Sequence, residues 1–303
     1  MKKVTKGTLG GIIPPIITPL TREGTLDEAG LRRVVDHCIA GGVSGVFAMG
    51  STGEAMRTSR QVWRDTLRVT LDQTAGRVPV FCGIVDTTTE RALENAKEAE
   101  QLGAEYLVAT SPFYIQNTCQ GEILRHYEKL AASIGQKLVV YNIPGMTNTC
   151  IAPETIAELA KIDNVVAFKD SSADWEHFQR CLYLLEGASL SIFNGAEELC
   201  AAAMVFGADG CVPGLGCVFP KVFVEMYKAA QAGDVAGASA LQRKVWHVRK
   251  SLSAGKSWLS AMKYLGCHLH LSGTDQASFP IEPLTDAEKA RIDRLVQESG
   301  VLD

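Results

Sequence analysis

The chain has 303 residues, of which 46% are hydrophobic and 21% charged, with a formal net charge of −4 at pH 7. This balance is typical of a soluble domain that can bury a core, and without a run of like charges neither nucleic acid nor an anionic membrane is expected as a partner. Nine cysteines lie scattered without a CxxC pair, which argues against a disulfide framework and a structural zinc site and favours reduced thiols in the cytoplasm.

An apolar stretch near the N-terminus follows several positive charges, as it would in a signal peptide. Pro14 and Pro15 interrupt this stretch, and no small-residue cleavage pattern comes after it. We therefore expect no signal peptide. No later segment approaches the roughly 18 uncharged apolar residues that a membrane-spanning helix needs, so none is expected.

Short apolar runs rich in β-branched residues recur along the chain and are predicted to be strands. In chain order the runs begin at Gly11, Gly45, Val78, Tyr106, Lys137, Val165, Ser189 and Gly210. Amphipathic stretches with helical spacing separate them, such as residues 90–103, which follow a capping Thr88 and stop at Gly103. Strand and helix alternate at spacings of roughly 20 to 35 residues, which predicts parallel pairing of the strands.

Eight such units close an α/β barrel, and we predict a (β/α)8 TIM barrel over residues 8–232. A doubly wound sheet is the competing fold, but the nearest match to its GxGxxG fingerprint is GLG at residues 214–216, after the last strand. Residues 233–303 are predicted to form a C-terminal helical layer that packs on the barrel as part of a single catalytic unit. Such barrels carry their chemistry at the carboxyl ends of the strands, so the candidate residues are those at strand ends.

Three groups of polar residues stand at predicted strand ends. GSTGE, residues 50–54, offers the hydroxyls of Ser51 and Thr52 and the backbone N–H groups of a glycine-flanked turn, which suit a carboxylate or phosphate. A helix cap is the alternative reading of these residues. Tyr141, in YNIP, could shuttle protons or simply pack. Lys169 ends the run VVAFK, where it either meets solvent or is held in a dry pocket for its chemistry.

Taken together, these groups fit one class of reaction. A lysine amine becomes a nucleophile when a dry surround disfavours its ammonium form, and with a carbonyl it then gives a Schiff base. The iminium is an electron sink, so a bond at the neighbouring carbon can be made or broken. A nearby phenol would supply protons, and a nest of backbone amides would hold the carboxylate of a 2-oxo acid beside the amine.

The sequence also resembles a known family. GSTGE, YNIP and a strand ending in FKD at these separations, preceded by IIPPIITPL, are similar to the family that contains dihydrodipicolinate synthase and N-acetylneuraminate lyase. The resemblance implies that Lys169 forms a Schiff base with pyruvate, or with the pyruvyl part of a larger 2-oxo acid, and that no other cofactor is used. It further implies that Tyr141 is the main proton donor and acceptor, and that Ser51 and Thr52 bind the pyruvyl carboxylate.

The same resemblance extends to the proton relay and the assembly. Ser51 would also link into the relay, and Val212 matches an apolar position whose backbone lies beside the bound pyruvate. Tyr114 matches the tyrosine that family members insert into the active site of a neighbouring subunit, within a homotetramer built as a dimer of dimers.

Met146 departs from the pattern of the dihydrodipicolinate synthases. At this position those enzymes carry an arginine for the second carboxylate of their aldehyde substrate. A methionine cannot make a bidentate charged contact, so this activity is disfavoured unless another cation reaches the site.

The segment NGAEE bears on the same part of the substrate. It places Gly195, Glu197 and Glu198 where sialic acid lyases contact sugar hydroxyls, although the aromatic residue of that cluster is missing here. Ser171 can donate a hydroxyl to such a substrate, or it can cap a helix that begins near Asp174.

We therefore expect a lyase of the aldolase type, acting on a 2-keto-3-deoxy sugar acid, a sialic acid or a 4-hydroxy-2-oxo acid. The alternatives are dihydrodipicolinate synthase proper, a 2-keto-3-deoxy sugar acid dehydratase, and a protein that binds a 2-oxo acid without turnover. His268 and His270 lie two residues apart, so on a helix they would face different ways, and no metal site is expected.

Overall fold

The computed structural model describes residues 9–302, so residues 8 and 303 of the predicted segments lie outside the described part. Within it, one sheet is formed by β1 (Gly11–Ile12), β2 (Val46–Ala48), β3 (Val80–Gly83), β4 (Tyr106–Thr110), β5 (Lys137–Asn142), β6 (Val165–Asp170), β7 (Ser191–Asn194) and β8 (Gly210–Cys211). Neighbouring strands pair in parallel in the order β1-β8-β7-β6-β5-β4-β3-β2.

The sheet closes on itself between β1 and β2. A parallel bridge joins Pro15 to Phe47, where the Phe47 N–H donates to the Pro14 carbonyl and the Ile16 N–H donates to the Phe47 carbonyl, each over 2.9 Å. Proline has no N–H for a strand ladder, so β1 ends at Ile12 instead of running through the whole predicted segment GIIPPIIT. The closed sheet is the predicted (β/α)8 barrel.

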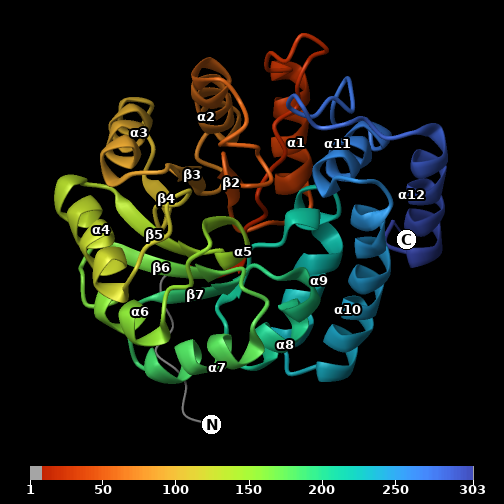
Figure 1. The fold of residues 1–303 in the computed structure, drawn as a ribbon. Helices are drawn as coiled ribbons and strands as arrows, with labels where there is room; N and C mark the ends of the chain where they lie inside the picture. The colour runs from red at the N-terminus through yellow and green to blue at the C-terminus, as the bar shows by residue number, and fades with distance from the viewer. Residues whose placement is uncertain (1–8, 303) are drawn as a thin grey trace.

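Helices surround the barrel, most of them on its outside, whereas the short helix that follows β5 lies over the strand ends (Figure 1). In chain order they are α1 (Glu28–Ala40), α2 (Arg60–Thr74), α3 (Thr89–Gln101), α4 (Gln120–Ser133), α5 (Pro144–Thr147), α6 (Pro153–Leu159), α7 (Trp175–Leu184), α8 (Cys200–Val205), α9 (Pro220–Gln231), α10 (Val235–Arg249), α11 (Trp258–His268) and α12 (Asp286–Ser299). Thr88 caps α3 as predicted, because its side chain accepts the Arg91 N–H.

The helices after β8 gather on one side of the barrel. Figure 1 shows α10, α11 and α12 next to α9 and α1, and the chain just after α11 is tied to α1 where the Gly273 N–H donates to Asp27 over 2.9 Å. The boundary at residue 232 between barrel and C-terminal layer stays a prediction. No helix in residues 9–302 has the length and apolar character needed to cross a membrane.

Apolar side chains pack on both faces of the sheet. The larger core lies between strands and helices and includes Leu31, Leu107 and Phe178. The smaller core fills the inside of the barrel and includes Phe47 and Tyr141. The barrel is therefore a packed support, and the polar residues considered below lie at the ends of its strands.

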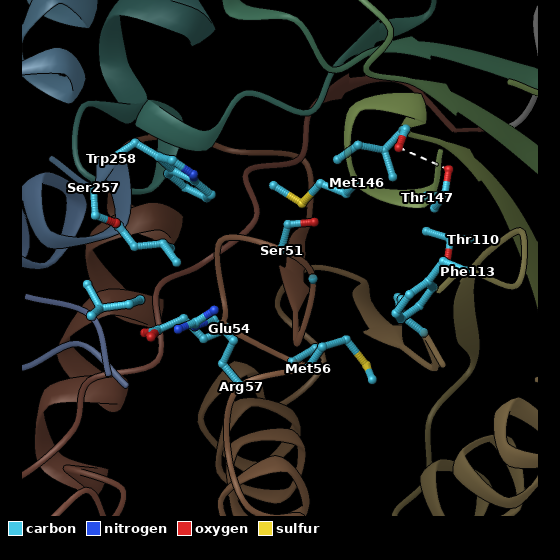
Figure 2. Close-up of a pocket in the computed structure, with 16 residues that line it drawn as sticks. Ser51, Glu54, Met56, Arg57, Thr110, Phe113, Met146, Thr147, Ser257 and Trp258 are labelled. Atoms are coloured by element: carbon cyan, nitrogen blue, oxygen red, sulfur yellow. Dashed lines mark hydrogen bonds between the residues drawn. The ribbon is translucent and has the colours of Figure 1, made fainter. Parts of the chain in front are cut away.

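The carboxyl ends of the strands face a hollow. Residues 50–57, which follow β2, lie across a pocket from α5, which follows β5, and from the start of α11 (Figure 2). The fold thus brings the first and last parts of the chain together around the strand ends.

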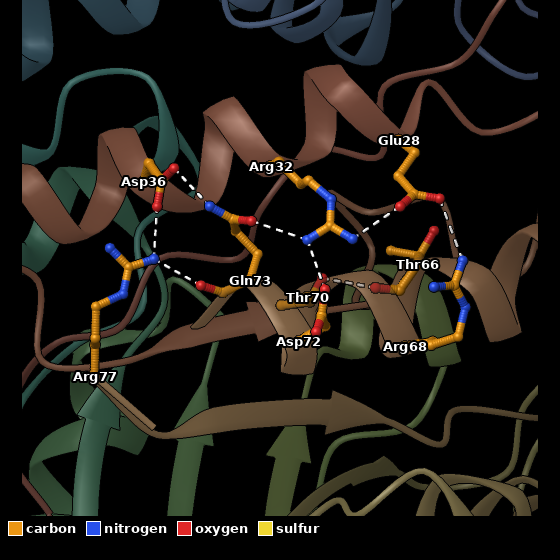
Figure 3. A network of polar contacts seen from close by, with 9 residues as sticks. All are labelled: Glu28, Arg32, Asp36, Thr66, Arg68, Thr70, Asp72, Gln73 and Arg77. Carbon is orange, nitrogen blue, oxygen red and sulfur yellow. Dashed lines mark hydrogen bonds and ion pairs between the residues drawn. The ribbon is translucent and has the colours of Figure 1, made fainter. Parts of the chain in front are cut away.

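A polar network joins α1 to α2 on the outer surface (Figure 3). Arg32 contacts Glu28 over 2.8 Å and Asp72 over 2.7 Å, and Arg77 contacts Asp36 over 2.6 Å. These side chains are between 31% and 61% exposed, so each pair is worth at most about 1 kcal/mol. The network fixes the spacing of the two helices and lies outside the pocket.

Candidate active site

Lys169 is buried at the end of β6, so the solvent-exposed reading of this residue is wrong. It is 4% exposed, and the strand register places it beside Tyr141 on β5. Its Nζ lies 3.9 Å from the centroid of the Tyr141 ring and 5.0 Å from that of Phe47. Burial lowers the pKa of the Lys169 amine, while the Tyr141 phenol opposes this shift. The surroundings therefore favour a neutral, nucleophilic amine.

The turn formed by residues 50–54 does not cap a helix. The helix that follows, α2, begins six residues after Glu54, at Arg60, and is capped by Ser59. The Glu54 N–H donates to the Ser51 carbonyl over 3.1 Å, whereas the N–H groups of Ser51 and Thr52 have no acceptor within residues 9–302. Two amides without an internal acceptor in one tight turn are available to an anion.

One cavity of about 400 Å³ brings the predicted residues together. It is lined by Ser51, Thr52, Tyr141, Met146, Lys169, Ser171, Gly195, Glu197, Glu198 and Val212, with further residues from the C-terminal helices. Every residue predicted to touch substrate within one subunit thus faces the same space.

Tyr114 is the exception among the predicted site residues. It lies in the loop after β4, is 88% exposed, and has a backbone φ of 75°. A bulky residue in the left-handed region is strained and needs a reason. The loop holds this ring out into solvent, away from its own cavity.

Gly195 leaves room for the Lys169 side chain. A Cβ built at this position would lie 2.8 Å from Lys169 Cε and would also strike the Ser171 hydroxyl. Any side chain here would displace the amine. Ser171 does not cap α7 as the alternative had it, because Asp174 accepts the His177 N–H over 3.0 Å and holds the cap.

Asp170 anchors β6 behind Lys169. Its carboxylate accepts from Asn142 Nδ2 over 2.7 Å and from the Ser172 hydroxyl over 2.8 Å, and the His177 Nδ1 lies 3.5 Å away. Burial opposes the charged form of His177, but the bond to Asp170 raises its pKa well above the usual range. This buried contact fixes the strand end that carries the amine.

Glu197, Glu198 and Arg249 form the polar end of the cavity. Glu197 Oε1 accepts the Leu215 N–H over 2.5 Å, and Arg249 Nε lies 3.1 Å from Glu198 Oε2 and 3.7 Å from Glu197 Oε2. Burial raises the pKa of the Glu197 carboxyl to about 7, with smaller opposing effects of the Leu215 N–H and Arg249. The cavity can thus offer both a proton donor and acceptors to a substrate hydroxyl.

A second chamber of about 390 Å³ opens beside the first (Figure 2). The two share Ser51, Ile143, Met146 and Trp258. Its other walls are mostly apolar, including Met56 and Phe113, with Arg57 as a cation. Met146 therefore stands between the chambers, half exposed.

Sequence reasoning missed the residues that the C-terminal helices bring to this site. Arg249 ends α10, Trp258 begins α11, and Met262 follows one turn later; all three line the first cavity. Nothing in the local sequence marks them, because no motif or strand end lies near them. Their place at the cavity follows from the packing of α10 and α11 beside the barrel.

The paired histidines do not form a metal site. His268 is the last residue of α11 and contacts Asp293 over 3.2 Å, whereas His270 lies beyond the helix with φ 58°. In residues 9–302, no group of three or more His, Cys, Asp or Glu side chains is arranged to hold a metal ion.

Three comparisons with known proteins bear on the site. The sequence profile of the dihydrodipicolinate synthetase family matches residues 8–299. The 4-hydroxy-tetrahydrodipicolinate synthase of Acidiphilium cryptum is 31% identical over 294 residues, which cover 96% of this chain and 99% of that protein.

Two solved structures are similar over nearly the whole chain. Dihydrodipicolinate synthase of Bacteroides thetaiotaomicron is 33% identical with a TM-score of 0.91, covering 97% of this chain and 100% of that one. A prophage protein of E. coli K12, described as a member of the dihydrodipicolinic acid synthase family in complex with pyruvate, is 26% identical with a TM-score of 0.92 and the same coverage. These names do not confirm the expected lean toward sugar-acid lyases.

Proposed function

This chain belongs to the dihydrodipicolinate synthetase family of pyruvate-dependent lyases, as its motifs predicted, and from that premise we propose that Lys169 forms an imine with a 2-oxo acid. The observation that carries the proposal is the dry Lys169 amine beside the Tyr141 ring, in one cavity with the free amides of Ser51 and Thr52. The carboxylate of the 2-oxo acid would lie on these amides, with its carbonyl carbon at the Lys169 nitrogen.

The reaction we propose begins when the neutral Lys169 amine adds to the 2-oxo carbon. A carbon–nitrogen bond forms, the carbonyl oxygen leaves as water, and Tyr141 carries the protons that this exchange requires. In the cleavage direction the C4 hydroxyl loses its proton, the C3–C4 bond breaks, and its electron pair moves into the iminium. An aldehyde leaves, the enamine is protonated at C3, and hydrolysis releases pyruvate and the amine.

We further propose that the aldehyde half lies toward Glu197 and Glu198. Their carboxyl groups and the Ser171 hydroxyl line the cavity beyond Lys169, where they suit the hydroxyls of a 2-keto-3-deoxy sugar acid, a sialic acid or a 4-hydroxy-2-oxo acid. Gly195, which leaves space beside Lys169, would let such a chain pass the amine.

A second candidate is dihydrodipicolinate synthase itself. Met146 cannot bind the second carboxylate of the aldehyde, but Arg249 lines the same cavity and supplies a cation that the local sequence did not place there. The names of the relatives also favour this activity. A dehydratase would use the same imine and expel a hydroxyl as water in place of an aldehyde.

We also propose that the protein works in the cytoplasm as a homotetramer. The exposure of Tyr114 and its left-handed backbone support this, because such a ring is available to a neighbouring subunit. The assembly is tested separately by measuring how activity depends on protein concentration, in the wild type and in Tyr114→Ala.

The imine is tested by borohydride reduction with pyruvate followed by peptide mass mapping. We expect one pyruvyl adduct on the Lys169 peptide and none in Lys169→Ala. Lys161→Ala, which removes an exposed lysine paired with Glu158, is the matched control and should be labelled like the wild type. An unlabelled Lys169 in the wild type would refute the central claim.

The aldehyde half is tested by offering pyruvate with a panel of aldehydes. Faster turnover with polyhydroxylated aldehydes than with aspartate semialdehyde would support the sugar-acid reading. Faster turnover with aspartate semialdehyde than with polyhydroxylated aldehydes would favour the synthase, if Arg249→Met removes this preference. Imine formation without turnover of any aldehyde and without exchange of the pyruvate methyl protons would indicate a binding protein.

A further inference from the structure

We propose that the buried ion pair between Glu54 and Lys263 positions the turn of residues 50–54, so that α11 sets the affinity of the site for the 2-oxo acid carboxylate. This inference rests on the proposed function, because it assigns to α11 a role in holding the carboxylate. Glu54 and Lys263 would be positioning residues, since neither lines the space around Lys169.

The pair is buried next to the second chamber, whose wall includes Glu54. Lys263 Nζ lies 2.7 Å from Glu54 Oε1, and the two side chains are 1% and 0% exposed. Lys263 Nζ also donates to the Thr18 carbonyl. Burial lowers the pKa of Lys263 and Glu54 opposes that shift, as expected for a cation held away from water by a single carboxylate.

The second carboxylate oxygen of Glu54, Oε2, also has a hydrogen-bond partner. Glu54 Oε2 accepts the Ser278 N–H over 2.8 Å, so the carboxylate is gripped by α11 and by the segment that follows it. Its backbone has φ 59°, a left-handed conformation that an L residue other than glycine adopts at a cost. The two side-chain contacts supply a reason for that conformation to persist.

The backbone of Glu54 connects its fixed side chain to the part of the turn that carries the Ser51 and Thr52 amides. Its N–H donates to the Ser51 carbonyl over 3.1 Å, and the Thr18 hydroxyl donates to the Gly53 carbonyl over 2.7 Å. Thr18 therefore contacts both the turn and Lys263. With Glu54 fixed at its side chain and at its backbone, the Ser51 and Thr52 amides are held in one orientation.

An ion pair that only stabilised the fold would not have to contact the turn that carries the Ser51 and Thr52 amides. Replacing a buried pair by apolar groups is often neutral for stability, so stability alone does not explain a pair at this place. Because the proposed carboxylate contacts are mainly backbone N–H groups, their positions depend directly on the orientation of the turn. A shift of about 1 Å in such contacts can change rates or affinity by up to 10²-fold.

The test measures how borohydride labelling of Lys169 depends on pyruvate concentration. The charge-neutral variant Glu54→Gln with Lys263→Met removes the pair without leaving a lone buried charge. We expect the half-saturating pyruvate concentration to rise roughly tenfold or more, while the labelling rate at saturating pyruvate stays within about threefold, because Lys169 and Tyr141 keep their places. Folding is followed by circular dichroism.

Two further variants keep the result decisive. Tyr264→Phe, on the same helix, removes hydrogen bonds to Asp293 of 2.9 and 3.0 Å and should leave pyruvate dependence unchanged. Thr18→Val keeps the ion pair and removes the bond to Gly53, so it should raise half-saturation even if the double variant fails to fold.

The possible outcomes separate this inference from the proposed function. If the wild type is labelled at Lys169 and the folded variants have the same half-saturating pyruvate concentration, the role of the pair is refuted. The imine is then still supported. Wild-type protein that is not labelled would overturn both.

Discussion

Glu197→Gln tests whether the cavity holds a carboxyl group that resists ionisation. Burial raises the pKa of Glu197 to about 7 from a model-compound value of 4.5. Because the folded-state pKa is the higher one, the carboxyl stabilises the fold below pH 4.5, and this contribution is lost as the pH rises to 7. The full difference of 2.5 pH units corresponds to about 3.4 kcal/mol, of which about 2.5 kcal/mol falls between pH 5 and pH 8.

The assay is urea unfolding of wild type and Glu197→Gln at fixed protein concentration and at several pH values from 5 to 8. The glutamine can keep the bond from the Leu215 N–H but does not titrate. The variant should therefore gain stability relative to wild type by about 2.5 kcal/mol as the pH rises across this range. The quantity to compare is the difference in unfolding free energy between variant and wild type at each pH. Other titrating groups change the unfolding free energy of both proteins equally, so their effects cancel in this difference.

The control is Glu158→Gln, which removes an equal formal charge from an exposed surface pair with Lys161. Its stability difference from wild type should change by less than about 1 kcal/mol over the same range. If the curves for wild type and Glu197→Gln run parallel from pH 5 to 8, Glu197 ionises normally and the reasoning from its burial is wrong.

Three other predictions concern the proton carrier, acid stability and the surface network. Tyr141→Phe should lower turnover by on the order of 10² and slow imine formation, measured as pyruvate release and as borohydride labelling; near-normal kinetics would remove it from the mechanism. His126, buried against the Thr110 carbonyl, has its pKa lowered by burial to about 4 from 6.5, so the unfolded chain takes up the proton first. Acid should therefore cost the wild type about 2.6 kcal/mol between pH 6.5 and 4 relative to His126→Gln, in urea unfolding at each pH; a constant difference would contradict this. Arg32→Ala, in the network of Figure 3, should cost no more than about 1 kcal/mol in thermal unfolding; a loss above about 3 kcal/mol would show that the network does more than space two helices.

The sequence was informative wherever the site is built from strand ends. Lys169, Tyr141 and the turn at Ser51 each follow an apolar run, and parallel pairing brings such ends to one edge of a barrel. Their convergence on one cavity was therefore predictable without coordinates. Tyr114 was predicted in the same way, but its partner would be another subunit, and one chain alone leaves its role a proposal.

The rest depended on contacts between distant segments. Arg249 lies on α10 and Lys263 on the largely apolar, buried α11, and no periodicity of either helix indicates which partners their charged ends meet. The predicted first strand was too long, because Pro14 and Pro15 give an extended apolar segment that cannot donate to a ladder. The high pKa of Glu197 comes from the closure of the cavity over it, which only the packed structure supplies.

The pairing of Glu54 with Lys263 also has a consequence for the order in which the molecule is made. On the ribosome the segment that carries β1 through β8 is complete at residue 211, more than fifty residues before Lys263 is synthesised. Until then the Glu54 carboxylate lacks its Lys263 partner, so we expect the turn beside it to reach its final form only after α11 is made. A nascent barrel can thus have its strands in place and still lack a finished site. Chimaeras that exchange C-terminal segments between relatives must carry a lysine at the position of Lys263 to complete it.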